Sequence, residues 1–342
     1  MRAAVLRAAG DVVVADVADP FIREPTDALV RVRVAAVCGS DLWAYRGQEQ
    51  IRPFDRLGHE WIGTVEEVGP QVSRLRRGDL VVAPFAFADG TCRMCSVGLY
   101  TSCPRGGIWG GASDGGQAEA LRVPFADATL VPVRADTDPD LDRRLLALTD
   151  VMGTGCHAVA LSGAAPGGSL VVIGDGAVGL CTVLAARRAR VERVLAVGHH
   201  GDRMRLAERF GATHTMRGDA PQAVAEILDY TGGGATSVAE CVGSQSALDL
   251  ALAVARPGGT VGSVGVPNGV FDTHPYRFFR DNITLRSGIA PVRRYLHALV
   301  ADVLTGTVDP SPVFTVEVTL ADVAEAYRAM DERRAVKALV RP

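Results

Sequence analysis

The stretch "LVVIGDGAVGL", from Leu170 to Leu180, decides the fold because it places three glycines in the pattern G-x-G-x-x-G. The residues before the first glycine have the composition of a strand, and "VGLCTVLAARRAR" after it has a helical pattern. Glycines at these places allow a tight turn and close backbone approach, and the N-terminus of the helix then binds a pyrophosphate. In this strand–turn–helix context the stretch predicts a dinucleotide-binding turn rather than an ordinary βα turn. The residues expected to contact the dinucleotide are Gly174, Gly176, Val178 and Gly179.

Short apolar strands alternate with helical patterns on the C-terminal side of residue 153. Helical patterns separate the first five of these strands from one another. Six strands with intervening helices predict a doubly wound parallel sheet, the Rossmann type of α/β fold. The strand patterns are "SLVVIG" (169–174), "RVLAVG" (193–198), "THTM" (213–216), "SVAECV" (237–242), "TVGSVG" (260–265) and "ITLRSG" (283–288).

The first 135 or so residues differ in composition and are rich in Gly, Pro and β-branched segments. "ALVRVRVAAV" (28–37) alternates with a period of two, as a half-buried strand does, and other short strands follow between turn residues. This pattern predicts an antiparallel barrel or sandwich. We therefore expect a β-rich domain over residues 1–152 and a dinucleotide-binding domain over residues 153–290. Residues 291–342 do not fit the six-strand count, so we expect them to return to the first domain.

The bulk properties exclude several classes of protein. A chain of 342 residues is long enough for two domains, and 48% hydrophobic with 22% charged residues is ordinary for a globular protein. A net charge of −3 gives no reason to expect nucleic acid or an anionic membrane surface as a partner. No apolar run approaches the roughly 20 residues that span a bilayer, and the N-terminus alternates like a strand rather than a signal peptide. Seven cysteines, an odd number, favour a reducing compartment, so we expect a cytoplasmic protein.

The strand "RVLAVG" ends at Gly198, close to where an acidic residue binds the ribose 2′-hydroxyl of NAD in such folds. A glycine there leaves room for the 2′-phosphate of NADP. His199, His200 and Arg203 follow, and the last two could donate hydrogen bonds to that phosphate. Alternatively these side chains are only solvated, and Asp202 binds the ribose from the loop. The pattern favours NADP(H) over NAD(H).

Two further motifs lie in the first domain. "CGSD" (38–41) follows a strand pattern, and "LGHEWIGTVEEVG" (57–69) comes later in the chain. Cysteine thiolate and histidine imidazole are preferred zinc ligands, and a catalytic zinc has three protein ligands and one open position. A single Cys or His is more often a packing residue, but the string G-H-E followed by two spaced glycines is far more specific than either residue alone.

The sequence resembles the zinc-dependent alcohol dehydrogenases of the medium-chain dehydrogenase/reductase superfamily over essentially its whole length. Residues 58–72 satisfy the family's zinc signature, G-H-E-x2-G-x5-G-x2-V. The resemblance implies a GroES-like catalytic barrel domain together with a Rossmann nucleotide-binding domain. It also implies a zinc-dependent oxidoreductase that transfers a hydride between NADP(H) or NAD(H) and an alcohol/carbonyl pair.

The resemblance implies a catalytic zinc site in the first domain. Cys38 and His59 would be two of its ligands. "LALTDVMGTGCHAV" places Asp150 where bacterial branches of the family have their third ligand. Glu60, next to the histidine, is a carboxylate that enters the metal shell in some relatives.

Two residues beside this zinc site would take part in catalysis. The resemblance places Ser40 next to the reacting oxygen as the first member of a proton relay, and Asp41 against the second nitrogen of His59. The family commonly has a histidine three residues after the serine, but this chain has Trp43, whose indole cannot accept a proton. Proton exit must then use cofactor hydroxyls, water or another side chain, which keeps a ketone or aldehyde reductase plausible. Further cofactor contacts implied by the resemblance are at Thr154, Gly265, Val266 and Gly288.

The family also has a lobe with a closed structural zinc site in the pattern C-x2-C-x2-C-x7-C, which residues 88–104 match with one change. Counting back from Cys103 through Cys95 and Cys92, the first position is Asp89. Zinc accepts carboxylate oxygen, and three thiolates with one carboxylate carry the same formal charge as four thiolates. We expect an occupied structural zinc that takes no part in the chemistry. The alternative is an unmetallated lobe with free thiols.

Other classes remain open at this point. Polyol, threonine and formaldehyde dehydrogenases use the same zinc site with a different cleft. A non-catalytic dinucleotide-binding protein is disfavoured because all three expected ligands of the catalytic zinc are present. We expect a small-molecule substrate whose pocket lies around Trp43, Trp61 and Trp109. Relatives of this kind form homodimers or homotetramers, often through the last strand of the nucleotide-binding sheet.

Overall fold

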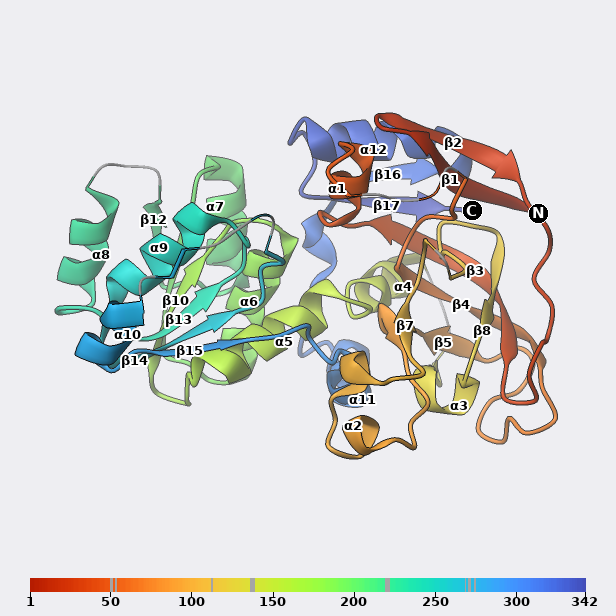
Figure 1. Cartoon of the computed structure of the whole chain (residues 1–342), viewed down its shortest axis with the longest axis horizontal. Helices are drawn as coiled ribbons and strands as arrows, with labels where there is room; N and C mark the ends of the chain where they lie inside the picture. Colours follow the sequence, from red (N-terminus) through yellow and green to blue (C-terminus); the bar gives the residue numbers. More distant parts are fainter. Residues whose placement is uncertain are drawn as a thin grey trace. The chain divides into compact units, whose positions relative to one another are not determined.

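A computed structural model of the chain shows two compact units, drawn in Figure 1. It describes residues 1–342 except residues 50, 51, 53, 112, 136–138, 219–221, 268, 270, 271 and 274 and the side chain of Pro139. One unit comprises residues 1–150 and 291–342, and the other comprises residues 151–290.

The unit of residues 151–290 is built on a six-stranded parallel sheet with the order β12-β11-β10-β13-β14-β15. The strand order reverses direction between β10 and β13, which is the topological switch point of a doubly wound sheet. The predicted doubly wound sheet is therefore confirmed, with one strand at each of the six predicted apolar runs. The strands are β10 (Ser169–Ile173), β11 (Arg193–Gly198), β12 (His214–Arg217), β13 (Ala235–Glu240), β14 (Ala255–Ser263) and β15 (Thr284–Ser287).

Helices cover both faces of this sheet. Alternate side chains of a strand point to opposite faces. Val261 of β14 belongs to the apolar core shared with α9, whereas a side chain at the neighbouring Gly262 would collide with α5. Burial on both faces explains why the central strands β10 and β11 are nearly continuous apolar runs, whereas the edge strands β12 and β15 contain polar residues and are partly exposed. The helices of this unit are α5 (Val151–Ser162), α6 (Ala177–Arg188), α7 (Gly201–Phe210), α8 (Ala223–Tyr230), α9 (Gln245–Val254) and α10 (Pro275–Asp281).

The unit of residues 1–150 and 291–342 is rich in β-structure. Its main sheet has the order β16-β17-β3-β4-β5-β9, and β8 also pairs with β3. All pairs in this sheet are antiparallel except β16 with β17. In β3, Arg31 is exposed between the buried Val30 and Val32, as the alternating pattern predicts. The strands are β1 (Arg2–Ala8), β2 (Asp11–Asp16), β3 (Ala28–Val37), β4 (Glu60–Val68), β5 (Leu80–Val82), β6 (Ala86–Phe87), β7 (Gly107–Ile108), β8 (Ala120–Val123), β9 (Val131–Val133), β16 (Phe314–Thr319) and β17 (Lys337–Arg341).

The helices of this unit are mostly short. The longer α12 packs on the β1–β2 hairpin, where Tyr327 shares an apolar core with Leu6 and Val12. Across the described part of the chain, no single helix is both long and apolar enough to cross a membrane, and the bent pair α4–α5 meets these criteria only when the two helices are combined. The helices are α1 (Asp41–Tyr45), α2 (Arg93–Ser96), α3 (Ala126–Thr129), α4 (Pro139–Leu146), α11 (Arg293–Leu304) and α12 (Val323–Asp331), with 3₁₀ turns η1 (Tyr100–Ser102), η2 (Ser311–Val313) and η3 (Leu320–Asp322).

The C-terminal strand β17 is an element that the sequence did not predict. It lies between β16 and β3 and pairs with both, so that Ala338 lies opposite Val37. Its apolar run is short and comes soon after a helical pattern, so neither length nor alternation distinguishes it. The pairing brings Lys337 next to the residues that end β3.

Candidate active site

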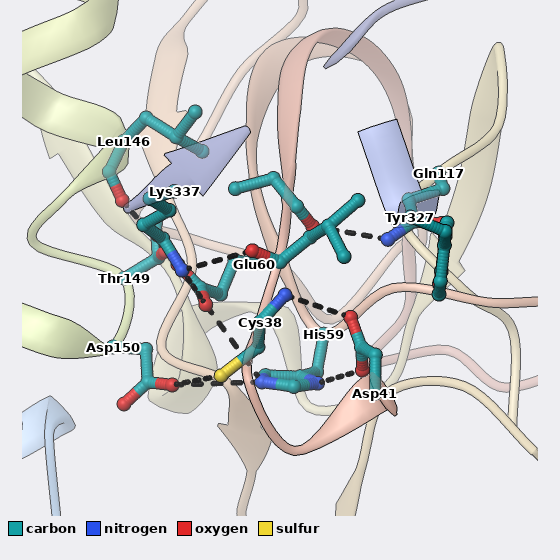
Figure 2. Close-up of polar contacts among 12 residues, drawn as sticks. Cys38, Asp41, His59, Glu60, Gln117, Leu146, Thr149, Asp150, Tyr327 and Lys337 are labelled. Atoms are coloured by element: carbon teal, nitrogen blue, oxygen red, sulfur yellow. Dashed lines mark hydrogen bonds and ion pairs between the residues drawn. The ribbon is translucent and has the colours of Figure 1, made fainter. Parts of the chain in front are cut away.

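Four potential metal-binding side chains meet in the unit of residues 1–150 and 291–342. They are Cys38, His59, Glu60 and Asp150, and one ligand atom from each lies within 4.8 Å of the others. Cys38 directly follows β3, and Glu60 begins β4 after His59. Because the two strands are antiparallel and Ala36 pairs with Glu60, the end of β3 lies beside the start of β4. Asp150 lies in the segment between α4 and α5, and its side chain completes the group (Figure 2).

The polar atoms of this cluster converge on one point. Oδ2 of Asp150 lies 3.6 Å from Sγ of Cys38 and 3.5 Å from Nε2 of His59. Oδ1 of Asp41 lies 3.1 Å from the other ring nitrogen, Nδ1. A carboxylate at Nδ1 favours the tautomer with its proton there, which leaves the Nε2 lone pair facing the thiol and Asp150. Asp41 also accepts a hydrogen bond from the Cys38 backbone N–H at 2.9 Å, so one side chain orients both residues.

The electrostatics of the cluster favour a cation. Burial raises the pKa of the Cys38 thiol and of the Glu60 carboxyl. Burial alone would lower the pKa of His59, but the charges of Asp41 and Cys38 outweigh it and raise that pKa well above its usual range. Oε2 of Glu60 is buried and has no hydrogen-bond partner among the described residues. Sulfur, nitrogen and carboxylate oxygen are zinc donors, so these residues fit a zinc ion.

Lys337 of β17 is a residue of this site that the sequence did not predict. Its Nζ donates to Oε1 of Glu60 at 2.5 Å and to the Val37 carbonyl at 3.2 Å, and its side chain is only 1% exposed. Burial disfavours the ammonium, but the charges of Glu60, Cys38 and Asp150 outweigh burial and raise the pKa of Lys337. One signal in the sequence could have singled out this residue: Lys337 is the only lysine among 36 lysine and arginine residues.

A second pair of residues supports the end of β3. Gln117 donates from Nε2 to the Ala36 carbonyl at 3.0 Å, and the buried Tyr327 donates from its hydroxyl to Oε1 of Gln117 at 3.0 Å (Figure 2). Tyr327 comes from α12, so the C-terminal segment contributes a further contact to this region. Sequence reasoning assigned neither residue a role.

The residues around α1 and the tryptophans occupy different environments. Ser40 and Trp43 are half-buried at the start of α1, close in sequence to Cys38. Trp61 and Trp109 are instead buried in the apolar core, 5.4 Å apart between ring centroids. The expectation that they line a substrate pocket is corrected accordingly, because they are 0% and 3% exposed.

A second group of potential metal-binding side chains, which contains three cysteines, lies in the lobe between β6 and β7. Ligand atoms of Asp89, Cys92, Cys95 and Cys103 lie within 4.8 Å of one another. Oδ1 of Asp89 accepts backbone N–H bonds from Thr91 at 2.7 Å and Cys92 at 2.9 Å.

An arginine that the sequence did not single out completes the surroundings of Asp89. Nε of Arg105 donates to Oδ2 of Asp89 at 2.8 Å. Burial raises the pKa of Asp89, but the N–H donors of Cys92 and Thr91 and the Arg105 guanidinium outweigh it, and the pKa lies below its usual range. The carboxylate is therefore anionic, as a metal ligand must be.

The glycine-rich turn joins β10 to α6 in the unit of residues 151–290. Gly174 directly follows β10, and Gly176 is the N-cap of α6. Val178 and Gly179 lie in the first turn of α6, where a Cβ on Gly179 would come within 1.9 Å of the Gly174 carbonyl oxygen. The turn is thus too tight for a side chain at position 179, as a pyrophosphate-binding turn requires.

The residues after β11 lie against this turn through Asp175. Its Oδ2 accepts the backbone N–H groups of His199 at 2.7 Å and His200 at 2.8 Å. Gly198 ends β11, and Arg203 lies in the first turn of α7. The structure therefore brings together the two segments that the sequence linked to the cofactor, through an aspartate that it did not single out.

The remaining predicted cofactor residues come from three other elements. Thr154 is buried in α5, Gly265 and Val266 follow β14, and Gly288 follows β15. Because the sheet is parallel, the loops after β10, β13 and β14 leave it at the same edge, where such folds bind ligands.

Glu240 connects two of these loops and was not predicted. Its Oε1 accepts the N–H groups of Val242 and Gly243, each at 2.7 Å, and its Oε2 accepts the Ser263 hydroxyl at 2.7 Å. Glu240 is 1% exposed and ends β13, so it fixes the loop after β13 to the end of β14.

Comparisons with known proteins agree with this arrangement. The model of the family described as "Alcohol dehydrogenase GroES-like domain" matches residues 24–134, and the model of the family described as "Zinc-binding dehydrogenase" matches residues 177–303. The "Uncharacterized zinc-type alcohol dehydrogenase-like protein AdhB" of Bacillus subtilis (strain 168) is 31% identical over 379 residues, covering 100% of both chains. The chain belongs to the zinc-dependent alcohol dehydrogenase family.

Solved structures of alcohol dehydrogenases share the fold. Alcohol dehydrogenase TADH from Thermus sp. ATN1 is 34% identical with a TM-score of 0.93, covering 100% of this chain and 99% of that one. A zinc-binding dehydrogenase from Sinorhizobium meliloti 1021, solved bound to NADP, is 27% identical with a TM-score of 0.87, covering 100% and 99%.

As a zinc-dependent alcohol dehydrogenase, the protein is an oxidoreductase that transfers a hydride between a nicotinamide cofactor and an alcohol/carbonyl pair. The predicted family, the combination of a GroES-like domain with a Rossmann fold, and the class of activity are confirmed. Zinc and a small-molecule substrate follow from membership of the family.

Proposed function

We propose that Cys38, His59 and Asp150 bind the catalytic zinc of this alcohol dehydrogenase, with Glu60 adjacent to it. The main support for this proposal is that a thiol, an imidazole and two carboxylates meet in a buried place, with their ligand atoms within 4.8 Å of one another. The lack of a hydrogen-bond partner for Oε2 of Glu60, within the described ranges, supports a cation there. Without one, this cluster would leave several acidic groups buried beside one another, which is costly.

The chain's own residues would prepare this site for the reaction. When bound, the zinc polarises the substrate oxygen and lowers its pKa, and the nicotinamide exchanges the hydride. Asp41 holds the proton on Nδ1 of His59 and thereby aims Nε2 at the metal position. The Ser40 hydroxyl would take up the proton that leaves the substrate hydroxyl while it passes its own proton on to the next acceptor. Trp43 offers only an N–H donor, so the proton continues through water or the cofactor hydroxyls.

A metal and cofactor assay on the purified protein tests this function. Zinc content is measured first, followed by turnover with NADP(H) and NAD(H) on a panel of alcohols, ketones and aldehydes. Threonine, polyols and formaldehyde belong in the panel, because a preference for one of them would assign the chain to the alternative dehydrogenases. A chain that holds no zinc and turns over no member of the panel would overturn the proposal.

We propose a second, structural zinc on Asp89, Cys92, Cys95 and Cys103. Asp89→Ala is expected to lower the zinc content from about two ions to about one per chain and Tm by about 5 °C or more. The kcat of the remaining folded enzyme should change much less, because the lobe carries no reacting group.

Arg105→Ala is the matched control for Asp89, since it removes the ion pair but leaves the carboxylate. It should retain both metal ions. Equal zinc content in Asp89→Ala and the wild type would show that Asp89 is not a ligand. Loss of turnover in a stable, fully metallated Asp89→Ala variant would contradict the structural role.

We further propose that NADP(H) is preferred over NAD(H). Gly198 offers no carboxylate to the ribose, and His200 and Arg203 lie beside the turn. Arg203→Ala is expected to raise the Kd of NADPH by about tenfold or more, because a charge-assisted hydrogen bond is lost, with little change for NADH. Fluorescence titration of both cofactors measures this. Arg209→Ala, at the other end of α7, is the control, and equal losses for both cofactors in Arg203→Ala would argue against 2′-phosphate binding.

The proposed assembly is a homodimer or homotetramer, and the proposed location is the cytoplasm. The edge strand β15 has a free side in the described part of the sheet, and Tyr276 and Phe279 of the nearby α10 are 71% and 82% exposed. An open strand edge with exposed aromatic residues close by is suited to pairing with a second copy. Analytical ultracentrifugation of the purified chain measures its oligomeric state.

A further inference from the structure

Asp175 occupies the space that a side chain at the end of β11 would take. A Cβ built on Gly198 would lie 2.6 Å from Cβ of Asp175 and 2.7 Å from its Oδ2. In NAD-binding sheets of this type, an acidic residue near the end of this strand binds the ribose 2′-hydroxyl. This chain has a carboxylate against the strand end after all, but it comes from the glycine-rich turn.

The contacts of Asp175 involve both side chains proposed to bind a 2′-phosphate. Its Oδ2 lies 2.9 Å from Nδ1 of His200, and its Oδ1 lies 3.8 Å from the Arg203 guanidinium. The backbone N–H groups of His199 and His200 hold the same carboxylate in place. Burial raises the pKa of Asp175, but these N–H donors outweigh it and lower the pKa, so the group is an anion.

An anion at this position acts differently on the two cofactors. A phosphate monoester carries about two negative charges near neutral pH, so a 2′-phosphate is repelled by a nearby carboxylate. A 2′-hydroxyl is neutral and can donate a hydrogen bond to the same carboxylate. The donors of His200 and Arg203 also face a negative charge of the protein itself before any cofactor arrives, which weakens their attraction for a phosphate.

We propose that Asp175 is a specificity-determining residue whose carboxylate opposes the binding of NADP(H) and preserves the use of NAD(H). This inference rests on the proposed role of Arg203 at the 2′-phosphate and deepens it. The stretch Gly198–Arg203 supplies the donors for the phosphate, and the turn supplies a carboxylate that fills the place beside Gly198 and limits the preference.

Asp175→Asn tests the inference, because asparagine keeps the shape and one carbonyl oxygen for the two backbone N–H groups but removes the charge. The Kd values of NADPH and NADH are measured by fluorescence titration of the zinc-loaded enzyme. The ratio of the NADPH to the NADH Kd is expected to fall by about tenfold. General damage to the turn would weaken both cofactors alike and leave the ratio unchanged. An unchanged or increased ratio overturns the inference.

Two further variants keep the test decisive. Asp175→Ser removes the charge with a smaller side chain, and it replaces Asp175→Asn if that variant has a lower Tm than the wild type. In Asp175→Asn combined with Arg203→Ala, the gain for NADPH should be smaller than in Asp175→Asn alone, because the part of it that acts through the Arg203 guanidinium is lost and only the relief of direct repulsion stays. If Arg203→Ala weakens NADPH selectively while Asp175→Asn leaves the ratio unchanged, the inference fails and the proposed NADP(H) preference stands. If Arg203→Ala weakens both cofactors equally, the proposed preference itself fails.

Discussion

Replacing any one of Cys38, His59 and Asp150 by alanine is expected to lower kcat/KM by about three orders of magnitude or more. Each substitution removes one of the three donors that meet within 4.8 Å and leaves a zinc ion without a full set of protein ligands. A loss of that size equals about 4 kcal/mol of transition-state stabilisation, which is what polarisation of the substrate oxygen by a metal supplies. The measurements are steady-state kinetics and zinc content per folded chain.

Asp140→Ala is the control for these ligand variants. Asp140 is an exposed residue of the neighbouring helix α4, and its loss should change neither zinc content nor kcat/KM. Circular dichroism shows whether each variant is folded. Wild-type kcat/KM in folded Asp150→Ala would remove that residue from the ligand set and leave Cys38 and His59 to be completed by another donor, such as Glu60.

Lys337→Met is expected to lower the free energy of unfolding by about 3–5 kcal/mol. The substitution removes the ammonium that donates to Oε1 of Glu60 and leaves a carboxylate that is 0% exposed without its partner. Urea unfolding followed by circular dichroism measures the change. Glu60→Met combined with Lys337→Met should recover part of the loss, because the pair is then replaced by apolar groups of similar volume.

A surface ion pair gives the comparison for Lys337. Nε of Arg46 lies 2.6 Å from Oδ1 of Asp331, but the two side chains are 40% and 33% exposed. Arg46→Ala should therefore lower the free energy of unfolding by less than about 1 kcal/mol. Because Lys337 is the only lysine, mass spectrometry after treatment with an amine reagent also reports on its burial. Rapid labelling of Lys337 in the folded protein, or a loss below about 1 kcal/mol in Lys337→Met, would contradict the buried pair.

Local signals were sufficient for the nucleotide-binding fold. The six strands of the parallel sheet lie at the predicted runs, and the signal was clearest for the central strands β10 and β11, because a strand buried on both faces is apolar throughout. The turn at Gly174–Gly179 could also be located, since a tight turn before a helix requires glycine at fixed places. β17 could not be located, because a short run that follows a helical pattern acquires its pairing only from distant strands.

The candidate metal site was predictable only in part. Resemblance to the family singled out Cys38, His59 and Asp150, and the structure brings them together. Their individual roles stay predictions until metal content and turnover are measured. Lys337 could not be placed, because its contact with Glu60 joins residues 277 positions apart.

The amino-acid sequence by itself determined where the six strands of the parallel sheet and the phosphate-binding turn lie. These properties depend on composition and spacing within a few residues, where backbone and side-chain preferences act. Tertiary structure alone decided that Lys337 pairs with Glu60, that Arg105 pairs with Asp89, and that Asp175 fills the place next to Gly198. The first two are ionic contacts and the third is a close approach of a charged side chain to a strand end, and each arises only when the fold brings two separate segments together.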